Sequence, residues 1–259
     1  MNRLTVTPGT LYAVGVGPGA PDLVTLRAAH ILGGVDAVLA ASSSGNDYSS
    51  ALNIALPHLR ADAEIVRLNF PMTRRRGILR KAWTQAANQA LAVLRTGKSA
   101  AFLTIGDPLV YSTFGYLLRE VRKKAPEQPV EIVPGITSFQ AAAARAEFIL
   151  CEGDETLRLL PGINDAEELE RELRGADTAV ILKVYRNIAG IGRALRDAGR
   201  DSGCLLASRV EQSGECISKG LPPAGETPPY MSLILSAGRA EKNPGQAAPR
   251  KAKLTSNPA

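Results

Sequence analysis

Three segments of this chain each run from an apolar stretch into a turn rich in glycine and proline. They read GVGPGAP at residues 15–21, IGDP at 105–108 and VPG at 133–135. A helical pattern follows each turn, and strands that alternate with helices predict a parallel sheet covered on both faces. Because the ligands of such sheets bind beyond the carboxyl ends of the strands, the three turns together predict a binding site at that edge.

The pattern of strands and helices changes near the middle of the chain. In the first half we expect strands at 10–16, 35–41, 99–108, which ends in a tight turn, and 130–135, and helices at 21–34, 50–59, 77–97, 111–121 and 136–146. In the second half we expect strands at 156–162, 178–185, 203–210, 215–221 and 228–238, and helices at 165–175 and 188–199. We therefore predict an α/β protein of two domains, 1–149 with a mostly parallel sheet and 150–238 with a mixed sheet.

The positive charge of the chain is concentrated at its end. The net charge is +6 and the isoelectric point about 9.4, yet residues 239–259 alone hold five basic residues and one acid. We expect this Pro-, Ala- and Lys-rich segment to be a disordered basic tail. Since the rest of the chain is close to neutral, we expect no nucleic-acid partner.

The remaining composition predicts a cytoplasmic protein without a membrane partner. No apolar run approaches the ~20 residues that span a bilayer, and the N-terminus MNRLTVTPGT lacks the apolar region of a signal peptide. We expect the three cysteines to be small buried residues. His30 and His58 are too few and too far apart to indicate a metal site.

The first turn formally matches a dinucleotide-binding motif, because Gly15, Gly17 and Ala20 satisfy G-x-G-x-x-G/A. However, the second strand carries its only acid, Asp36, near its beginning, whereas a ribose-binding acid belongs at its end. Pro18 also removes an N–H group where a phosphate needs donors. Sharp turns of this kind can instead present carbonyl oxygens, which suit a cationic ligand. The alternative to a binding site is that these three segments are ordinary strand-to-helix turns.

The motifs and their order resemble those of the tetrapyrrole methylases, which use S-adenosyl-L-methionine. The family pattern GxGPGxxxLxTL is matched at residues 15–26, GDP at 106–108 and PGxxS at 134–138, and the resemblance covers residues 9–238. Within the family, GDPLVYSTFGYLLREV, VEIVPGITSFQAAAARA, EGDETLRLLPG and ILKVYRN look most like the branch that methylates carbon 20 of precorrin-2 in cobalamin biosynthesis. One departure is Arg75-Arg76 after FPMTR, where that branch has an acid.

The resemblance implies a homodimer whose subunits bind the cofactor in a cleft between two domains and release S-adenosyl-L-homocysteine. From the first domain it implies cofactor contacts by Pro18, Ile105, Gly106, Asp107, Val110, Ser112, Thr113, Thr137 and Ser138. From the second domain it implies contacts by Leu182, Lys183, Val184, Val210 and Glu211, although RVEQSGE departs from the family's commoner ENGT pattern.

The implied reaction is methyl transfer to a nucleophilic carbon of the macrocycle, followed by loss of a proton from that carbon. We expect Asp107 to be the base or an anchor for the cofactor's amino group; a turn bond to its own loop is the alternative. Lys183, predicted to lie within an apolar strand, and Tyr185 are the other catalytic candidates. Tyr185 is also a candidate to hydrogen-bond the substrate, and a structural role is its alternative.

The tetrapyrrole substrate of this branch is a polyanion, which favours arginine and lysine side chains at the site. We expect Arg74 and Arg75 of MTRRRGILRK to bind it; a solvated helix start is the alternative. The rival functions are methylation at another tetrapyrrole carbon, ribosomal-RNA methylation, for which an SDAGTP-like signature is missing, and a non-catalytic nucleotide-binding regulator, for which a P-loop is missing. The sequence leaves open whether the substrate contains cobalt.

Overall fold

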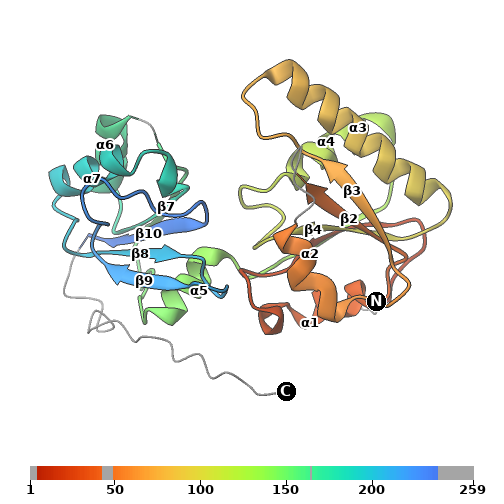
Figure 1. Ribbon diagram of the computed structural model, residues 1–259, viewed down its shortest axis with the longest axis horizontal. Helices are drawn as coiled ribbons and strands as arrows, with labels where there is room; N and C mark the ends of the chain where they lie inside the picture. The colour runs from red at the N-terminus through yellow and green to blue at the C-terminus, as the bar shows by residue number, and fades with distance from the viewer. Residues whose placement is uncertain (1–4, 43–48, 164, 239–259) are drawn as a thin grey trace. The chain divides into compact units, whose positions relative to one another are not determined.

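The chain divides into two compact units, Met1–Ser138 and Phe139–Ala259, and each contains one sheet. The computed structural model describes residues 5–42, 49–163 and 165–238, and Figure 1 shows their elements. The predicted tail at 239–259 lies outside the described residues.

The first unit contains a five-stranded parallel sheet, which confirms the predicted type. Its strands are β1 (Leu11–Gly15), β2 (Ala37–Ser42), β3 (Glu64–Asn69), β4 (Ala100–Thr104) and β5 (Val130–Val133), in the order β3-β2-β4-β1-β5. The sequence pattern misses the edge strand β3. Its segment EIVRLN buries only Leu68 fully, so it lacks the continuous apolar run that marks the inner strands.

Helices cover both faces of this sheet (Figure 1). One face carries α1 (Leu26–Leu32) and α2 (Ser50–Ala55), which continues into the 3-10 turn η2 (Leu56–His58), and the other face carries α3 (Arg76–Arg95) and α4 (Phe114–Lys124). Strand β1 places Tyr12 and Val14 in one core and Leu11 and Ala13 in the other. Because both sets are buried, β1 reads as an unbroken apolar run.

The helix predicted at 21–34 is two separate elements. A 3-10 turn, η1 (Pro21–Leu23), is followed by the extended residue Val24. The next residue, Thr25, caps α1 because its hydroxyl accepts a hydrogen bond from the Ala28 N–H at 3.2 Å.

The second unit contains a five-stranded mixed sheet, which confirms the second prediction of sheet type. Its strands are β6 (Leu157–Leu160), β7 (Thr178–Leu182), β8 (Cys204–Ser208), β9 (Cys216–Lys219) and β10 (Ser232–Ala237), in the order β6-β7-β10-β8-β9 with only β6 and β7 parallel. α6 (Ala166–Arg174) and α7 (Ile188–Asp197) cover one face, and α5 (Ser138–Arg145) packs on the other.

The division between the units falls before residues 139–149, which the sequence pattern assigns to the first domain. In the structure Ala142 and Phe148 pack in one core with Val180 of β7 and Leu233 of β10. This long-range burial, which no local pattern reveals, places the segment in the second unit.

The cysteines differ from the expectation of three buried residues. Only Cys204 is buried, and burial raises the pKa of its thiol to about 11. Cys151 and Cys216 are exposed. Among the described residues, no helix combines the length and the apolar character needed to cross a membrane.

Candidate active site

The three predicted turns lie side by side in the first unit. Strand β1 pairs with β4 on one side and with β5 on the other. Because the three strands are parallel, their carboxyl ends share one edge, where ligands of such sheets bind. We call residues 15–20, 105–113 and 134–138, which leave the strands at this edge, the glycine rim.

Glycines bring the three turns into direct contact. A Cβ atom on Gly15 would lie 2.5 Å from the carbonyl oxygen of Gly106 and 2.6 Å from the nitrogen of Gly135. A Cβ atom on Gly135 would lie 2.1 Å from the same carbonyl oxygen. All three distances are too short for any side chain, so the glycine rim is closed by main-chain packing.

Main-chain hydrogen bonds join the first two turns. The Val16 N–H donates to the Thr104 carbonyl at 2.9 Å, and the Gly106 N–H donates to the Gly17 carbonyl at 2.8 Å. Gly17 has a φ of +76°, and a Cβ there would lie 2.9 Å from the Leu23 carbonyl oxygen. The Gly17 carbonyl therefore accepts a hydrogen bond within the rim, whereas the sequence predicts that carbonyl oxygens of these turns face a ligand.

Asp107 joins the second turn to the third. Its Oδ1 accepts a hydrogen bond from the Leu109 N–H at 2.8 Å, and its Oδ2 accepts one from the Gly135 N–H at 3.1 Å. The turn bond considered as an alternative is therefore present, and a cross-link between loops accompanies it. Both carboxylate oxygens are oriented by backbone donors, which gives the glycine rim one fixed negative charge.

The loop that follows Asp107 is also held by hydrogen bonds. The Val110 N–H donates to the Asp107 carbonyl at 3.3 Å. Ser112 Oγ accepts a hydrogen bond from the Phe114 N–H at 3.0 Å and lies 3.2 Å from the hydroxyl of Thr104. Ser112 thus has a structural role at the start of α4.

The other predicted residues of the first unit differ in exposure. Pro18 and Thr137 are buried, and Ile105 is half-buried against the core beneath the sheet. Thr113 is exposed at the start of α4, and Ser138 is the first residue of α5. The Cα of Thr137 lies 3.8 Å from the position a Gly106 Cβ would take, so this residue adjoins the glycine cluster.

In the second unit, the predicted segment Leu182–Tyr185 follows β7. Lys183 does not lie within a strand as predicted: β7 ends at Leu182, and Lys183 has a left-handed φ of +58° before the 3-10 turn η3 (Val184–Arg186). Burial lowers the pKa of the Lys183 ammonium, and the positive charge of Arg186 lowers it further. The Val184 side chain is fully buried in the core, so only its backbone can meet a ligand.

The segment Val210–Glu211 follows β8 at the same end of the sheet. Strand β10 lies between β7 and β8 and is antiparallel to both, so the carboxyl ends of β7 and β8 coincide. Val210 is buried in the core, whereas Glu211 lies 3.6 Å from the guanidinium of Arg145. We call residues 183–186 and 209–211 the β7–β8 edge.

Backbone strain marks both candidate regions. Among the described residues, five that are not glycine have positive φ: Tyr111, Glu147, Lys183, Arg209 and Glu211. All but Glu147 lie in the glycine rim or the β7–β8 edge. Strained residues of this kind gather at functional sites, because there the geometry has a use beyond stability. The sequence reasoning missed Tyr111 and Arg209, and only their backbone conformation identifies them.

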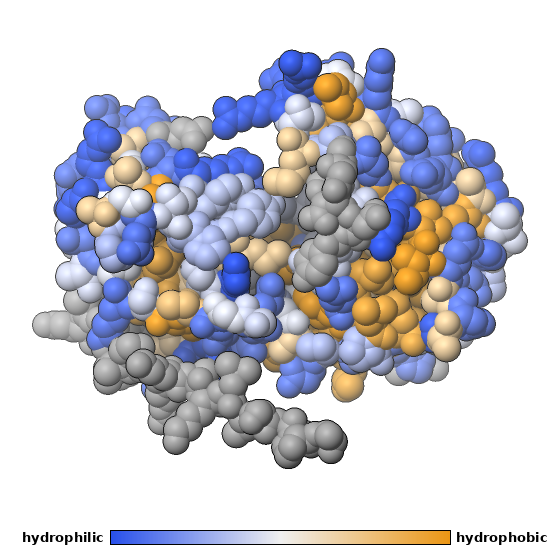
Figure 2. Space-filling model, in the orientation of Figure 1, coloured by the Kyte–Doolittle hydropathy of each residue, from blue (hydrophilic) through white to orange (hydrophobic). Residues whose placement is uncertain are grey.

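The predicted substrate-binding arginines stand at the start of α3. Arg74, Arg75 and Arg76 are exposed, and the first turn of α3 contains no acid. Within the part of the chain that the structure describes, none of the three forms an ion pair with a carboxylate. Figure 2 shows the resulting hydrophilic surface over this end of α3. Three cations without a carboxylate partner among the described residues repel the dipole of this helix N-terminus, so they suit an anionic ligand.

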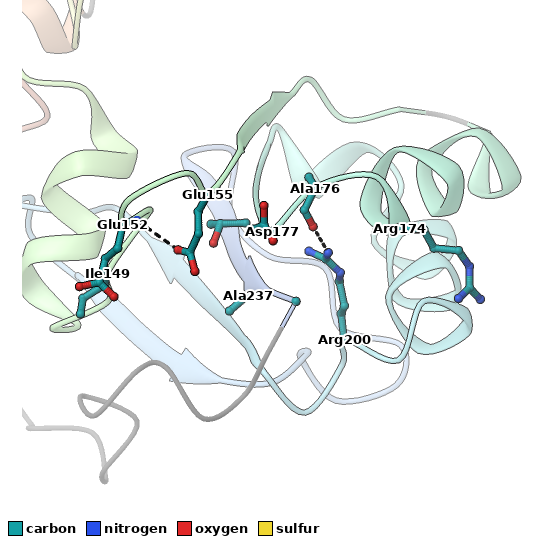
Figure 3. Close-up of a pocket in the computed structure, with 10 residues that line it drawn as sticks. Ile149, Glu152, Glu155, Arg174, Ala176, Asp177, Arg200 and Ala237 are labelled. Atoms are coloured by element: carbon teal, nitrogen blue, oxygen red, sulfur yellow. Dashed lines mark hydrogen bonds between the residues drawn. The ribbon is translucent and has the colours of Figure 1, made fainter.

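A cavity of about 210 Å³ opens at the other end of the second sheet (Figure 3). It is lined by Thr178, the first residue of β7, and by Ala237, the last of β10. Arg200 is 6% exposed there and donates to the Ala176 carbonyl, as the dashed line in Figure 3 marks. The cavity therefore lies at the opposite end of β7 from Lys183 and does not belong to the β7–β8 edge.

Asp36 lies at the amino end of the first sheet, away from the glycine rim. It directly precedes β2, and its Oδ2 accepts hydrogen bonds from the N–H and the hydroxyl of Ser99, both at 2.8 Å. These bonds lower the pKa of Asp36. Its position is incompatible with binding a ribose at the carboxyl end of the strands, which supports the rejection of a dinucleotide site.

Known proteins resemble this chain over most of its length. The cobalt-precorrin-2 C(20)-methyltransferase of Salmonella typhimurium is 35% identical over 229 residues, which cover 88% of this chain and 95% of that protein. The precorrin-2 C(20)-methyltransferase of a Sinorhizobium species is 32% identical over 238 residues, covering 89% and 96%. A crystal structure of uroporphyrin-III C-methyltransferase from Thermus thermophilus, complexed with S-adenosylhomocysteine, shares the fold with a TM-score of 0.65 at 21% identity, covering 88% and 92%. Residues 10–215 match the model of the Tetrapyrrole (Corrin/Porphyrin) Methylases, and the chain belongs to this family.

Proposed function

We propose that this protein methylates carbon 20 of precorrin-2 or of its cobalt-containing counterpart, in cobalamin biosynthesis, with S-adenosyl-L-methionine as methyl donor. Family membership supports the reaction class. The two relatives named above, which this chain matches over nearly their full length, support the position of the methyl group. One name specifies a cobalt-containing substrate and the other does not, so both substrates belong to the proposal.

The glycine rim is the observation that carries the proposal. It offers main chain without Cβ atoms at Gly15, Gly106 and Gly135, and one carboxylate oriented by two N–H donors. This combination fits a ligand that carries a sulfonium and an ammonium group, whereas it offers no cation to a phosphate. The complex of the Thermus thermophilus relative with S-adenosylhomocysteine supports the same cofactor.

The chain's own groups then have distinct tasks. When bound, the cofactor supplies an electrophilic methyl group, and correct positioning of the two reactants contributes about 7–11 kcal/mol to such reactions. We assign Asp107 to anchoring the cofactor's ammonium, because both of its oxygens are already oriented by the loops. We assign Lys183 to removing the proton from the methylated carbon, because burial favours its neutral form.

The remaining predicted residues complete the proposed site. Cofactor contacts from the first unit are proposed for Pro18, Ile105, Gly106, Val110, Ser112, Thr113, Thr137 and Ser138. Contacts from the second unit are proposed for Leu182, Val184, Val210 and Glu211. Arg74 and Arg75 are proposed to bind carboxylates of the macrocycle, since they are exposed cations without a carboxylate partner among the described residues.

The proposal includes a cytoplasmic homodimer that binds neither nucleic acid nor membranes and needs no protein-bound metal. The family resemblance supports the dimer. Light scattering of the purified chain tests it, with a mass of twice 27.4 kDa expected.

Incubation with methyl-labelled S-adenosyl-L-methionine and each substrate form tests the function itself. We expect the label at carbon 20 of precorrin-2, cobalt-precorrin-2 or both, as located by NMR. Calorimetric titration should also show binding of S-adenosyl-L-homocysteine and none of NAD or ATP. A methyl group at another carbon would support the rival methylases of the same family instead, and binding of NAD or ATP alone would support the nucleotide-binding regulator.

A further inference from the structure

Tyr185, the predicted substrate-binding tyrosine, packs against an aromatic ring that local sequence patterns do not predict. Strands β7 and β10 are antiparallel, with Leu182 opposite Leu233. The residues after β7 and those before β10 therefore lie at the same end of the sheet, although Lys183 and η3 leave the extended conformation of the strand. There the ring centroids of Tyr185 and Tyr230 lie 5.0 Å apart, with the rings tilted by 49°.

Tyr230 also adjoins the segment after β8. Strands β8 and β10 are antiparallel, with Ser208 opposite Ser232. The pairing continues past the strand ends, where the Arg209 N–H donates to the Met231 carbonyl at 2.8 Å. Tyr230 therefore stands between the two segments of the β7–β8 edge, although the sequence places it 45 residues after Tyr185.

Arg186 completes the group. Its Nε donates a hydrogen bond to the hydroxyl of Tyr185 at 3.0 Å, and its guanidinium carbon lies 5.7 Å from the centre of that ring. The side chain is exposed. In the described parts of the chain it forms no ion pair with a carboxylate. The guanidinium is thus held over an aromatic ring while the rest of its donor fork remains available to an anion.

Tyr230 is a largely exposed aromatic residue. It is 59% exposed, and only Met231 separates it from β10, a strand whose residues are all buried. An exposed tyrosine whose ring is tilted against a second tyrosine, with an arginine over that second ring, presents an aromatic surface with a cation at its border. Such a surface matches a flat heterocycle that carries a carboxylate.

We propose that Tyr185, Tyr230 and Arg186 bind one pyrrole ring of the tetrapyrrole, with the tyrosine rings packing against the heterocycle and Arg186 pairing with an acetate or propionate on it. This inference rests on the proposed function and extends it by two residues, Tyr230 and Arg186. The cofactor also has a flat base and a carboxylate, but these stand at opposite ends of the molecule, whereas a pyrrole ring of the substrate carries its acetate or propionate directly. The position of Arg186 beside the two rings therefore favours the macrocycle.

Steady-state kinetics with both substrates varied test this assignment. The Tyr230→Ala variant should raise the KM for the tetrapyrrole about 5-fold, because aromatic pairs contribute modestly. The Arg186→Gln variant should raise it about 20-fold, because a charge-assisted pair is lost. In both variants the KM for S-adenosyl-L-methionine and the Kd of S-adenosyl-L-homocysteine should stay within twofold. Tyr230→Phe keeps the ring and should match the wild type.

Arg193→Gln is the matched control, since this arginine is exposed on α7 of the same unit and should leave all constants unchanged. Two outcomes overturn the inference: an unchanged KM for the tetrapyrrole in both Tyr230→Ala and Arg186→Gln, or a weakened Kd of S-adenosyl-L-homocysteine with tetrapyrrole KM intact. Failure of the proposed function looks different, because then the wild-type protein itself neither binds S-adenosyl-L-homocysteine nor methylates the tetrapyrrole.

Discussion

The glycine rim of the first sheet and the β7–β8 edge of the second both contain tightly turned backbone, but different kinds of residue form it. In the glycine rim, glycines take the crowded positions, and backbone touches backbone at Gly15, Gly106 and Gly135. At the β7–β8 edge, residues with side chains take the left-handed positions, at Lys183, Arg209 and Glu211.

Glycine and other residues differ in the free-energy cost of positive φ. A glycine adopts positive φ without steric cost, whereas another residue loses about 1 kcal/mol or more there. The fold therefore accepts left-handed strain at three positions of the β7–β8 edge and at Tyr111 of the rim, whereas Gly17 and Gly106 of the rim adopt positive φ without it. We infer that the rim provides shape through its main chain and that the β7–β8 edge provides chemistry through its side chains. This contrast makes five predictions, from the largest expected effect to the smallest.

The Gly135→Ala variant should damage the fold most. Its Cβ would lie 2.1 Å from the Gly106 carbonyl oxygen, and neither backbone can yield without separating the turns. We expect a loss of about 3 kcal/mol in the free energy of unfolding and no measurable binding of S-adenosyl-L-homocysteine. Gly77→Ala is the control: a Cβ there meets nothing within 4 Å, so this helical position should become slightly more stable. A melting temperature of Gly135→Ala equal to that of the wild type would show that the rim is not closed by main-chain packing.

The Asp107→Ala variant should lose activity far more than stability. We expect kcat/KM to fall about 100-fold, while the loss of two hydrogen bonds at a partly exposed loop costs about 1–2 kcal/mol in unfolding free energy. An anchoring role predicts a weaker Kd of S-adenosyl-L-homocysteine; a base would lower kcat and leave that Kd unchanged. Asp62→Ala, which removes an exposed carboxylate of the same unit, is the control. Unchanged turnover would remove Asp107 from the site.

Neutralising Arg74 and Arg75 together tests whether the first unit also binds carboxylates of the substrate, as proposed for Arg186 of the second unit. The double change to glutamine should raise the KM for the tetrapyrrole about 10-fold at low salt, and less at high salt because exposed charges are screened. Arg95→Gln, at the other end of α3, should have no effect. An unchanged KM for the tetrapyrrole would indicate that these arginines are only solvated residues at the start of α3.

The Lys183→Gly variant separates strain from function. Removing the side chain relieves both the left-handed strain and the cost of burying an ammonium, so the melting temperature should stay equal or rise by a few degrees. Methyl transfer should nevertheless fall at least about 10-fold. Glu147→Gly is the matched control, because Glu147 has a similar φ of +51° outside both candidate regions. A variant of Lys183 with full activity would contradict the idea that this edge accepts strain for its chemistry.

The Asp36→Asn variant should have the smallest effect, confined to stability. Hydrogen bonds from Ser99 hold the pKa of Asp36 below its usual 3.8. The carboxylate therefore stabilises the fold above that pH and loses this contribution as the pH falls through the folded-state pKa. At neutral pH the variant should lose about 1 kcal/mol, a value reduced by solvent screening, and the gap to wild type should close in acid. Urea unfolding across pH measures this; a gap that persists in strong acid would rule out the titration of Asp36 as its cause.

Much of the fold could be predicted because its signals are local. The inner strands of the first sheet are buried on both faces and read as apolar runs, and the glycine turns mark their ends. Strand β3 escaped prediction because an edge strand with one fully buried residue has no such run. Lys183 was misplaced because the apolar pattern of β7 continues into Val184, although the strand ends at Leu182.

By itself, the sequence determined the two sheet types, the order of most strands and helices within each half, and the three turns that identify the family. These follow from residue periodicity and from the φ values that glycine and proline allow, which are properties of neighbours along the chain. Only the tertiary structure decided that Asp107 clamps Gly135, that residues 139–149 join the second unit, and that Tyr230 packs on Tyr185. Each of these depends on which strands become neighbours, and strand order is set by packing among residues far apart in the sequence.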